Sequence, residues 1–463
     1  MNVIIGAGVG GLAAATALAR AGEPAMILEG RASVGGLASG IALEGVVHDG
    51  GPYILLDRPG LSWAFERLGA DLDTQVDLIH LDDEVYRVTS AGHPSVSIFA
   101  DLHRTASTLE AQWPGSGAAY EAWISRMTGI YDNLVELQRD PRPGAWKLLK
   151  KGRFREGLFL LQGLAAHLER SGLPQPVRDA LGIWTHIAGQ PLAEAPAPLA
   201  FVPAIIHTHG AYVVRGGMAR IVEALRALAV EAGVEIRCGT RVDRIVRDGS
   251  RILGVEAGGQ RITAERVFSN APGIGTYVEL LHPPEPKMSA QLSALPLQSP
   301  GVAAYLHMTV DDTVPFLQFW LPPPGPTDWT RVLVNPGAYD PDRVEQGRLV
   351  SPTRHAWANT VGEDGQRAFL EHILAESWWR RGVRAHRVLA TRIPKEWGRQ
   401  YLLYRDSMNP VMTASFMRRG RLAHKSPVAD NLYLAGSATH PGQWVSFCSI
   451  SGILAVEEAL ARR

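Results

Sequence analysis

Three glycines near the start of the chain, Gly6, Gly8 and Gly11, form the pattern G-x-G-x-x-G directly after a short apolar run at residues 3–5. Glycines at these positions let the backbone turn tightly and approach a pyrophosphate. A helical pattern follows over residues 12–19, so the free N–H groups and the dipole of its first turn would face the phosphates. This opening segment therefore predicts a dinucleotide-binding site.

An acidic residue completes the opening unit. A second apolar run at residues 25–28 ends in Glu29, which follows Gly11 by 18 residues. That spacing is close to the roughly 20 residues expected for the carboxylate that accepts hydrogen bonds from the ribose hydroxyls. Such a carboxylate would repel a 2′-phosphate, but the motif by itself does not distinguish FAD from NAD.

Further glycine-rich turns favour one of these cofactors. Gly35-Gly36 follows Glu29 closely, and residues 48–53 form another such turn. Near the other end of the chain, a strand expected at residues 431–435 ends in Gly436, and a closing helix is expected over residues 447–460. The N-terminus of that helix would stabilise a flavin edge that becomes negative on reduction. Two strand–glycine–helix units at opposite ends of the chain fit FAD, with the pyrophosphate at one unit and the isoalloxazine at the other.

Composition excludes several classes of protein. The 463 residues carry 46 basic and 46 acidic side chains, so no net charge points to nucleic acid. The two cysteines, Cys238 and Cys448, make neither a disulfide framework nor a metal-binding spacing. The glycine motif begins at residue 6, and no apolar run reaches the ~18 residues of a membrane span. We therefore expect a cytoplasmic protein without a leader peptide or a transmembrane helix.

Four segments together resemble the FAD-dependent amine-oxidase-like superfamily, and within it the phytoene (carotenoid) desaturase group. They are residues 4–11 with Glu29, residues 35–52, residues 214–246 around Gly216-Gly217-Met218, and residues 431–452 with the ending Thr439-His440-Pro441-Gly442. Their order along nearly the whole chain is more specific than any one segment. The resemblance implies that Val242 pairs with the adenine through its backbone and that Asn270 lies near the flavin.

The chain departs from many relatives at the flavin end. Leu37 stands where many have an arginine, and Ser437 stands where many flavoproteins have an acid, which desaturases also often lack. Residues 443–446 are bulkier than the glycine-rich stretch expected there. The residues predicted to bind FAD are Gly6, Gly8, Gly10, Gly11, Glu29, Gly30, Arg31, Gly35, Gly36, Leu37, Gly50, Gly51, Pro52, Tyr53, Val242, Asn270, Gly436, Ser437, Gly442, Gln443, Trp444 and Val445.

The strands and helices expected from the sequence predict an α/β protein, α+β overall. A Rossmann-like FAD-binding domain would be interleaved with a substrate domain of mixed sheet and helices. Residues 102–192 have a mostly helical pattern, and an amphipathic helix is expected at 366–376. Strands are expected at 302–310, 316–321, 332–335 and 354–360. The predicted FAD-binding domain comprises residues 1–70, 212–285 and 415–463, and the substrate domain comprises residues 71–211 and 286–414.

Residues 146–161, within a helical part around 115–192, interleave cations with large apolar side chains. Either this segment lies in the headgroup region of an anionic membrane, or it forms an ordinary helix pair with a solvated basic face. The desaturase resemblance favours peripheral membrane contact, because the substrates of that group dissolve in lipid.

Four residues are predicted to act near the substrate: His209, Arg215, His440 and Trp444. Alternation would place His207 and His209 on one face of a strand, facing the substrate cavity. The alternative for these imidazoles is an ordinary structural role. A histidine pair of this spacing is also half of a metal site, but the sequence supplies no partners, so no metal is predicted.

The leading functional class is an FAD-dependent desaturase that transfers a hydride from a carotenoid, an isoprenoid or a similar apolar substrate to flavin N5. A saturase or isomerase that uses reduced flavin on a polyene is one alternative. An amine or porphyrinogen oxidase of the same superfamily is another, and a flavin-binding scaffold without activity is a fourth. The chain has no second complete dinucleotide fingerprint, which disfavours a tightly bound NAD(P)H.

Overall fold

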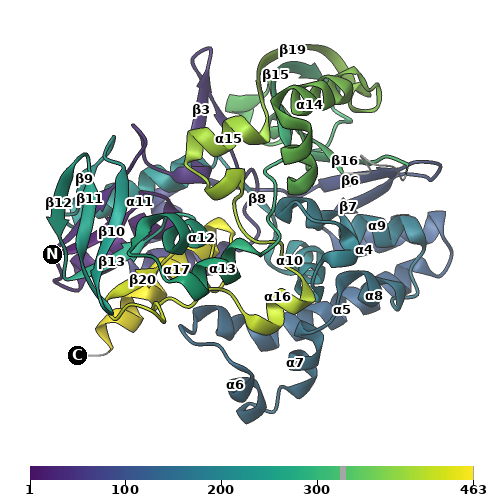
Figure 1. The fold of residues 1–463 in the computed structure, drawn as a ribbon. Helices are drawn as coiled ribbons and strands as arrows, with labels where there is room; N and C mark the ends of the chain where they lie inside the picture. Colours follow the sequence, from purple (N-terminus) through teal and green to yellow (C-terminus); the bar gives the residue numbers. More distant parts are fainter. Residues whose placement is uncertain (324–329, 462–463) are drawn as a thin grey trace.

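The computed structural model describes residues 1–323 and 330–461. The chain forms two halves that lie side by side (Figure 1), one built around a parallel sheet and the other around a larger mixed sheet. The first and last long helices of the chain pack together in the half that contains the parallel sheet.

The parallel sheet has five strands in the order β20-β13-β1-β2-β9. Its strands are apolar on both faces because both faces are covered. Ile4 packs toward the helices on one face, whereas Val3 and Ile5 pack toward a smaller sheet on the other. The strands are β1 (Asn2–Ile5), β2 (Ala25–Leu28), β9 (Glu235–Arg237), β13 (Arg266–Ser269) and β20 (Leu432–Leu434).

Three helices cover one face of this sheet: α1 (Val9–Arg20), α11 (Ala219–Glu231) and α17 (Val445–Leu460). Helices α1 and α17 approach each other very closely. A Cβ atom at Gly452 would lie only 2.3 Å from the carbonyl oxygen of Gly10. The close approach therefore requires glycine at position 452, and it brings the starts of the two helices together.

The opposite face is covered by a four-stranded sheet in the order β12-β11-β10-β14. Three of its strands form an antiparallel meander. The strands are β10 (Val242–Asp248), β11 (Arg251–Ala257), β12 (Gln260–Thr263) and β14 (Leu281–His282). Three different stretches of the chain thus build this half. The residue limits of the two domains stay a prediction from the sequence.

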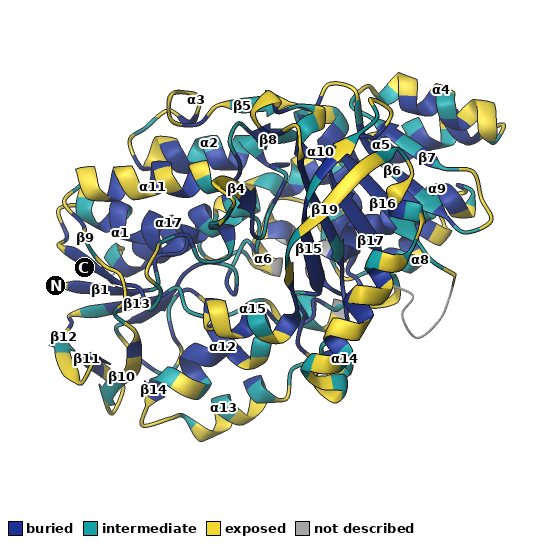
Figure 2. Ribbon diagram, turned by 90° about the horizontal axis from the view of Figure 1, so that it is seen from above, coloured by how far each residue is buried: buried dark blue, intermediate teal, exposed yellow. Residues whose placement is uncertain are grey.

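The other half contains a seven-stranded mixed sheet in the order β19-β15-β18-β17-β16-β6-β7. Its inner strands are buried, whereas the edge strand β19 is mostly exposed (Figure 2). The strands are β6 (Glu84–Ser90), β7 (Val96–Phe99), β15 (Val302–Val310), β16 (Leu317–Leu321), β17 (Arg331–Val334), β18 (Gln346–Ser351) and β19 (Val383–Arg392). Two small ribbons pair β3 (Gly40–Leu43) with β4 (Val46–Asp49) and β5 (Leu78–His80) with β8 (Tyr212–Val214).

Helices pack against one end of this sheet, as predicted for residues 102–192. Within this layer, α6 and α7 lie at the periphery of the molecule (Figure 1). The helices are α4 (Leu102–Gln112), α5 (Ser116–Leu134), α6 (Ala145–Lys150), α7 (Phe154–Leu160), α8 (Leu164–Glu169), α9 (Gln175–Gly182) and α10 (Phe201–His209). The remaining helices include α2 (Arg58–Arg67), α3 (Leu72–Gln75), α12 (Gly273–Gly275), α13 (Pro286–Ser293), α14 (His355–Ala375), α15 (Pro394–Tyr401) and α16 (Ala414–Arg419).

Two strand predictions are wrong. The strand expected to carry His207 and His209 is the end of helix α10, and the strand expected at 354–360 is the start of α14. Both segments are short, and a short apolar pattern does not distinguish a strand from a buried helix. The helix expected at 366–376 is confirmed as the second part of α14. Strands β7, β11, β12, β18 and β19 lie outside the predicted strands.

Candidate active site

A cavity of about 330 Å³ lies where the starts of α1 and α17 meet the mixed sheet. It collects residues from both ends of the chain and from the sheet between them. Over half of the predicted FAD-binding residues line it. Those are Gly8, Gly10, Gly35, Gly36, Leu37, Gly51, Pro52, Tyr53, Asn270, Ser437, Gln443, Trp444 and Val445.

Two helix N-termini face this one cavity. Helix α1 begins after Gly8 and helix α17 begins after Trp444, and neither N-cap residue supplies a side-chain hydrogen bond. Both first turns therefore keep backbone N–H groups for another acceptor, and both dipoles favour negative charge at the cavity. This is the arrangement that a pyrophosphate at one end and a reduced flavin at the other would need.

The glycines leave room at this junction. A Cβ atom at Gly10 would lie 2.7 Å from the Cα of Gly436 and 2.7 Å from Oδ1 of Asn270. A Cβ atom at Gly8 would lie 2.6 Å from Nδ2 of Asn270. Asn270 thus occupies the space between the two glycine turns, and the open cradle with its free N–H donors fits a dinucleotide.

Glu29 lies at the end of β2, beside the cavity wall rather than in it. Its carboxylate accepts hydrogen bonds from the backbone N–H groups of Ala7 at 2.7 Å and Arg31 at 2.8 Å. The Arg31 guanidinium donates to the carbonyl oxygen of Gly36 at 3.2 Å and lies 4.4 Å from the ring centre of Tyr401. Glu29 and Arg31 therefore brace the glycine turns where the adenosine ribose is expected.

The remaining predicted FAD-binding residues do not line the cavity. A Cβ atom at Gly11 would lie 2.1 Å from the carbonyl oxygen of Gly6, so these two glycines shape the turn itself. Val242 begins strand β10 and is buried in the core against the parallel sheet. The residues outside the lining are Gly6, Gly11, Glu29, Gly30, Arg31, Gly50, Val242, Gly436 and Gly442.

Of the four residues predicted to act near the substrate, the structure brings only Trp444 to the cavity. His440 donates from Nε2 to the carbonyl oxygen of Leu137 at 2.6 Å. Arg215 forms an exposed ion pair with Asp77. His209 ends helix α10. Position next to a glycine turn in the sequence did not determine where these side chains point, because the packing of other elements decides that.

The polar residues on the cavity wall that were not predicted include His186 and Arg348. The contact that Tyr53 makes was not predicted either. His186 donates from Nδ1 to the carbonyl oxygen of Ile183 at 2.8 Å, so its Nε2 accepts from the Tyr53 hydroxyl at 2.5 Å. Burial lowers the pKa of His186 to about 4, and burial raises the pKa of the Tyr53 hydroxyl. The pair is therefore neutral at pH 7. No short motif signals a contact between residues so far apart in the sequence.

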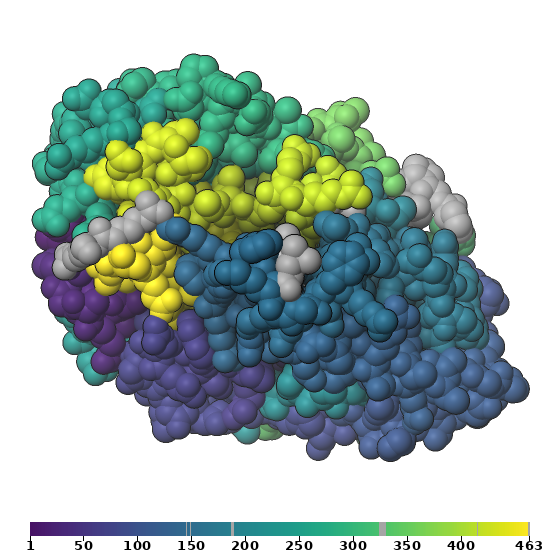
Figure 3. Space-filling view, turned by 90° about the horizontal axis from the view of Figure 1, so that it is seen from below, coloured from purple at the N-terminus to yellow at the C-terminus, as the bar shows by residue number. Residues whose placement is uncertain are grey.

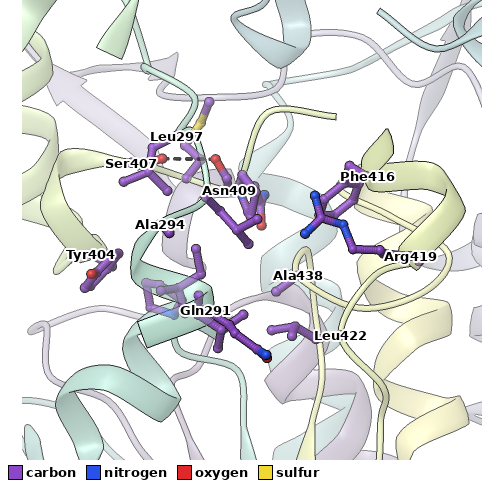
Figure 4. Close-up of a pocket in the computed structure, with 18 residues that line it drawn as sticks. Gln291, Ala294, Leu297, Tyr404, Ser407, Asn409, Phe416, Arg419, Leu422 and Ala438 are labelled. Atoms are coloured by element: carbon purple, nitrogen blue, oxygen red, sulfur yellow. Dashed lines mark hydrogen bonds between the residues drawn. The ribbon is translucent and has the colours of Figure 1, made fainter. Parts of the chain in front are cut away.

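Most of the remaining wall is apolar, including Trp184, Val350 and Trp397. A second cavity of about 500 Å³ adjoins the first, and the two share Pro272, Met408 and Asn409. Figure 4 shows its labelled side chains, which come from separate stretches of the chain. On the face in Figure 3, the segment around residues 400–425 crosses beside the helical layer. Together the cavities offer a long, largely apolar space.

We expect the protein to lose stability steeply in mild acid. Burial lowers the pKa of His48, His167, His186 and His440 to about 4. In an unfolded chain these imidazoles titrate near 6.5. Between these values the unfolded state binds more protons, so the free energy of unfolding is largest above pH ~6.5 and falls toward pH ~4. Each group would contribute up to ~3 kcal/mol to this loss.

Urea unfolding measured at a series of pH values tests this expectation. His186→Gln should reduce the slope of the free energy of unfolding against pH, since it removes one of the buried imidazoles. The reduction should correspond to about one fewer proton taken up on unfolding. His93→Gln, at an exposed position, should leave the slope unchanged. Stability that does not vary between pH 7 and pH 5 would contradict the prediction.

Comparisons with known proteins agree with this geometry. Residues 9–460 match the family described as flavin containing amine oxidoreductase. A zeta-carotene-forming phytoene desaturase from Myxococcus xanthus is 28% identical over 66% of this chain and 60% of that protein. A hydroxyneurosporene desaturase from Rubrivivax gelatinosus is 26% identical over 99% of this chain and 93% of that protein. A solved wild-type putrescine oxidase bound to putrescine has a TM-score of 0.67 at 16% identity, covering 100% of this chain and 99% of that chain.

The solved structure confirms the predicted fold class, a Rossmann-like FAD-binding part combined with a mixed sheet and helices. The family match confirms that the chain is an oxidoreductase with FAD as its cofactor, which the glycine cradle fits. The match covers almost the entire sequence, from the first turn of α1 to the last residue of α17. The chain belongs to the family of flavin-containing amine oxidoreductases.

Proposed function

We propose that the protein is an FAD-dependent desaturase that dehydrogenates a carotenoid, an isoprenoid or a similar apolar chain. The observation that carries this proposal is the cavity itself, in which two helix N-termini meet walls that are mostly apolar. The carotenoid desaturases among the relatives support the same substrate class.

Bound FAD would supply the hydride acceptor, since the isoalloxazine carries out the redox chemistry. The start of α17 would then stabilise the negative charge that develops on reduction. Trp184, Trp397 and Trp444 would hold an apolar chain against the flavin and exclude water. The neutral Tyr53–His186 pair is the candidate on the cavity wall for holding or transferring a proton.

An amine oxidase is less well supported than a desaturase. Arg348 places a positive charge on the cavity wall, which would repel a protonated amine. Asp57 also lines the cavity, but its Oδ1 caps helix α2 by accepting from the N–H of Gly60 at 3.0 Å, and burial raises its pKa. A saturase or isomerase would use the same cavity with reduced flavin, so the experiment below must also test that direction.

Anaerobic mixing of the FAD-loaded enzyme with candidate substrates tests the proposal. Phytoene in detergent micelles should bleach the visible flavin absorbance, whereas putrescine should not. Bleaching by putrescine alone would favour the amine oxidase. Conversion of a more unsaturated polyene by dithionite-reduced enzyme, without bleaching by phytoene, would favour the saturase or isomerase. Protein that neither contains flavin nor takes up FAD would contradict all of these functions.

Trp444→Ala should weaken binding of an apolar substrate by about tenfold, because it removes a large aromatic wall from the cavity. In the structure the Trp444 ring stacks on Phe447, with ring centres 4.9 Å apart. The expected change is a higher KM, measured by steady-state kinetics with rates normalised to the bound flavin of each variant. Trp63→Ala, outside the cavity, is the matched control and should leave KM unchanged. Equal KM values for both variants would show that Trp444 does not contact substrate.

We also propose that α6 and α7 contact a lipid surface. Among the large apolar side chains there, Trp146 is 67% exposed, Phe154 59% and Leu158 46%. Lys147 and Lys151 already pair with Asp140 and Glu136, respectively, so the apolar side chains would contribute most of the binding. Among the helices of the described residues, none combines the length and apolar character needed to cross a bilayer.

Co-sedimentation with phosphatidylglycerol vesicles tests the membrane contact. A triple Trp146/Phe154/Leu158→Ser variant should bind more than about tenfold more weakly than wild type, because each buried side chain contributes roughly 1.5–3 kcal/mol. The vesicle binding lost by a Lys147/Lys150/Lys151→Glu variant should be smaller in high salt than in low salt, because salt screens charges. Equal, negligible pelleting of all three proteins would leave the solvated helix pair as the correct interpretation.

A further inference from the structure

Arg348 is a buried cation on the wall of the cavity. Its side chain is 8% exposed, and its Nη1 donates to the carbonyl oxygens of Asp49 at 3.0 Å and Gly51 at 2.6 Å. Throughout residues 1–323 and 330–461, no carboxylate forms an ion pair with it. The neighbouring Asp49 carboxylate is already occupied by Arg343, at 2.7 Å.

One edge of the Arg348 guanidinium has no acceptor. Its Nη1 is used by the two carbonyl oxygens, whereas its Nε has no hydrogen-bond partner among the described residues. Nε itself is fully buried, so the donors left for a ligand are the Nη2–H groups, which can give charge-assisted hydrogen bonds to a carboxylate oxygen. Burying a charge without a counter-ion costs several kcal/mol, so an anionic ligand would stabilise this corner.

The surroundings of Arg348 favour a ligand with a single polar end. Its guanidinium carbon lies 6.0 Å from the ring centre of Tyr53 and 5.7 Å from that of Tyr305. Tyr53 is bound to the neutral His186, so no negative charge of that pair competes for the arginine. Beyond this corner the walls are largely apolar, and they continue into the second cavity.

We propose that the Arg348 corner binds the carboxylate end of an otherwise apolar polyene or isoprenoid chain, so that a chain ending in an acid binds more tightly than the corresponding pure hydrocarbon. This inference rests on the proposed function, because the apolar part of the chain would occupy the same cavity beside the flavin. The carboxylate would fix how far the chain extends past the flavin and therefore which carbon–carbon bond is presented for reaction.

Two matched probes test the inference. All-trans-retinoate and all-trans-retinol carry the same polyene and differ in the polar end. Isothermal titration calorimetry of each into the FAD-loaded enzyme should show that retinoate binds at least about tenfold more tightly. The measurement reports binding alone and requires no turnover.

Variants of Arg348 separate charge from geometry. Arg348→Met should weaken retinoate binding by about 10- to 100-fold and retinol binding by less than about threefold, because only the carboxylate loses charge-assisted hydrogen bonds. Arg348→Lys should fall between, since it keeps the charge but not the planar guanidinium with its fixed donors. Arg387→Met, at an exposed position on β19, is the matched control and should change neither affinity.

If Arg348→Met loses flavin, the comparison of the two probes in Arg348→Lys decides the question. Equal affinities of the wild type for both probes, or an equal loss of both in the variants, would overturn the inference. A changed flavin reduction potential with an unchanged retinoate-to-retinol ratio would also overturn it and assign Arg348 to the flavin. Preference for retinoate without flavin bleaching by any polyene would instead contradict the proposed desaturase and leave the carboxylate site standing.

Discussion

Gly10→Ala should yield a protein that no longer retains FAD. The new Cβ atom would lie 2.7 Å from the Cα and 2.8 Å from the backbone nitrogen of Gly436, and 2.7 Å from Oδ1 of Asn270. Two of these atoms belong to the backbone, so the turns at the starts of α1 and α17 would have to separate. Because overpacking costs about 1–3 kcal/mol and the shift falls in the cofactor cradle, we expect FAD affinity to drop by about 10- to 100-fold.

The ratio of flavin to protein after purification, and titration of the apoprotein with FAD, measure this effect. Gly129→Ala is the matched control. Gly129 lies exposed inside helix α5, and a Cβ atom there would meet nothing within 4 Å. This control should bind FAD normally and gain up to about 1 kcal/mol of stability, because alanine is the better helix former. Full FAD binding by Gly10→Ala would contradict a single cradle made from both ends of the chain.

Arg343→Met should destabilise the fold by about 3–5 kcal/mol, since it leaves a buried carboxylate without its cation. Arg343 and Asp49 form an ion pair at 2.7 Å, and each side chain is 5% exposed. The other Asp49 oxygen accepts from the N–H of Met218 at 2.7 Å, next to the Gly216-Gly217 turn. The pair thus joins three distant stretches of the chain beside the cavity. Urea unfolding and the release of bound flavin would measure the loss.

A double variant identifies the cause of this effect. Arg343→Met combined with Asp49→Leu should be less destabilised than the sum of the two single changes, because no unpaired charge remains buried. Arg399→Met breaks an exposed ion pair with Glu363 and should barely change stability. A loss for Arg343→Met no greater than that of Arg399→Met would show that the buried pair does not hold these stretches together.

The strand–glycine–helix elements that are predicted to bind FAD could be recognised in the sequence because their conformation is local. Gly6 has φ +91° and Gly436 has φ +86°, values that side chains other than glycine rarely adopt. Each glycine lies between a short apolar strand and a helix, so residues adjacent in the sequence are enough to identify the motif. The acid at the end of β2 follows at a spacing that the strand–helix–strand unit itself sets.

The positions of the predicted catalytic residues could not be predicted in the same way, because their roles depend on where their side chains point. The sequence predicts His209 on a strand, whereas it ends helix α10, and its ring lies 5.6 Å from that of Tyr131. His440 stands in the predicted turn, yet its ring turns toward Leu137 in the helical layer. A sequence pattern indicates which residues share an element, but the packing of other elements decides what each side chain faces.

The sequence by itself determined the cofactor, the family and the strand–glycine–helix elements predicted to hold the pyrophosphate, since those depend on glycines, strands and helices that are adjacent along the chain. Only the tertiary structure decided which side chains line the cavity proposed for the substrate. Tyr53, His186 and Arg348 come from separate stretches of the chain, and they meet because the mixed sheet and the helical layer close over the cavity. Contacts of such long range leave no periodicity or spacing in the sequence, and the buried, unpaired edge of Arg348 exists only in the folded protein.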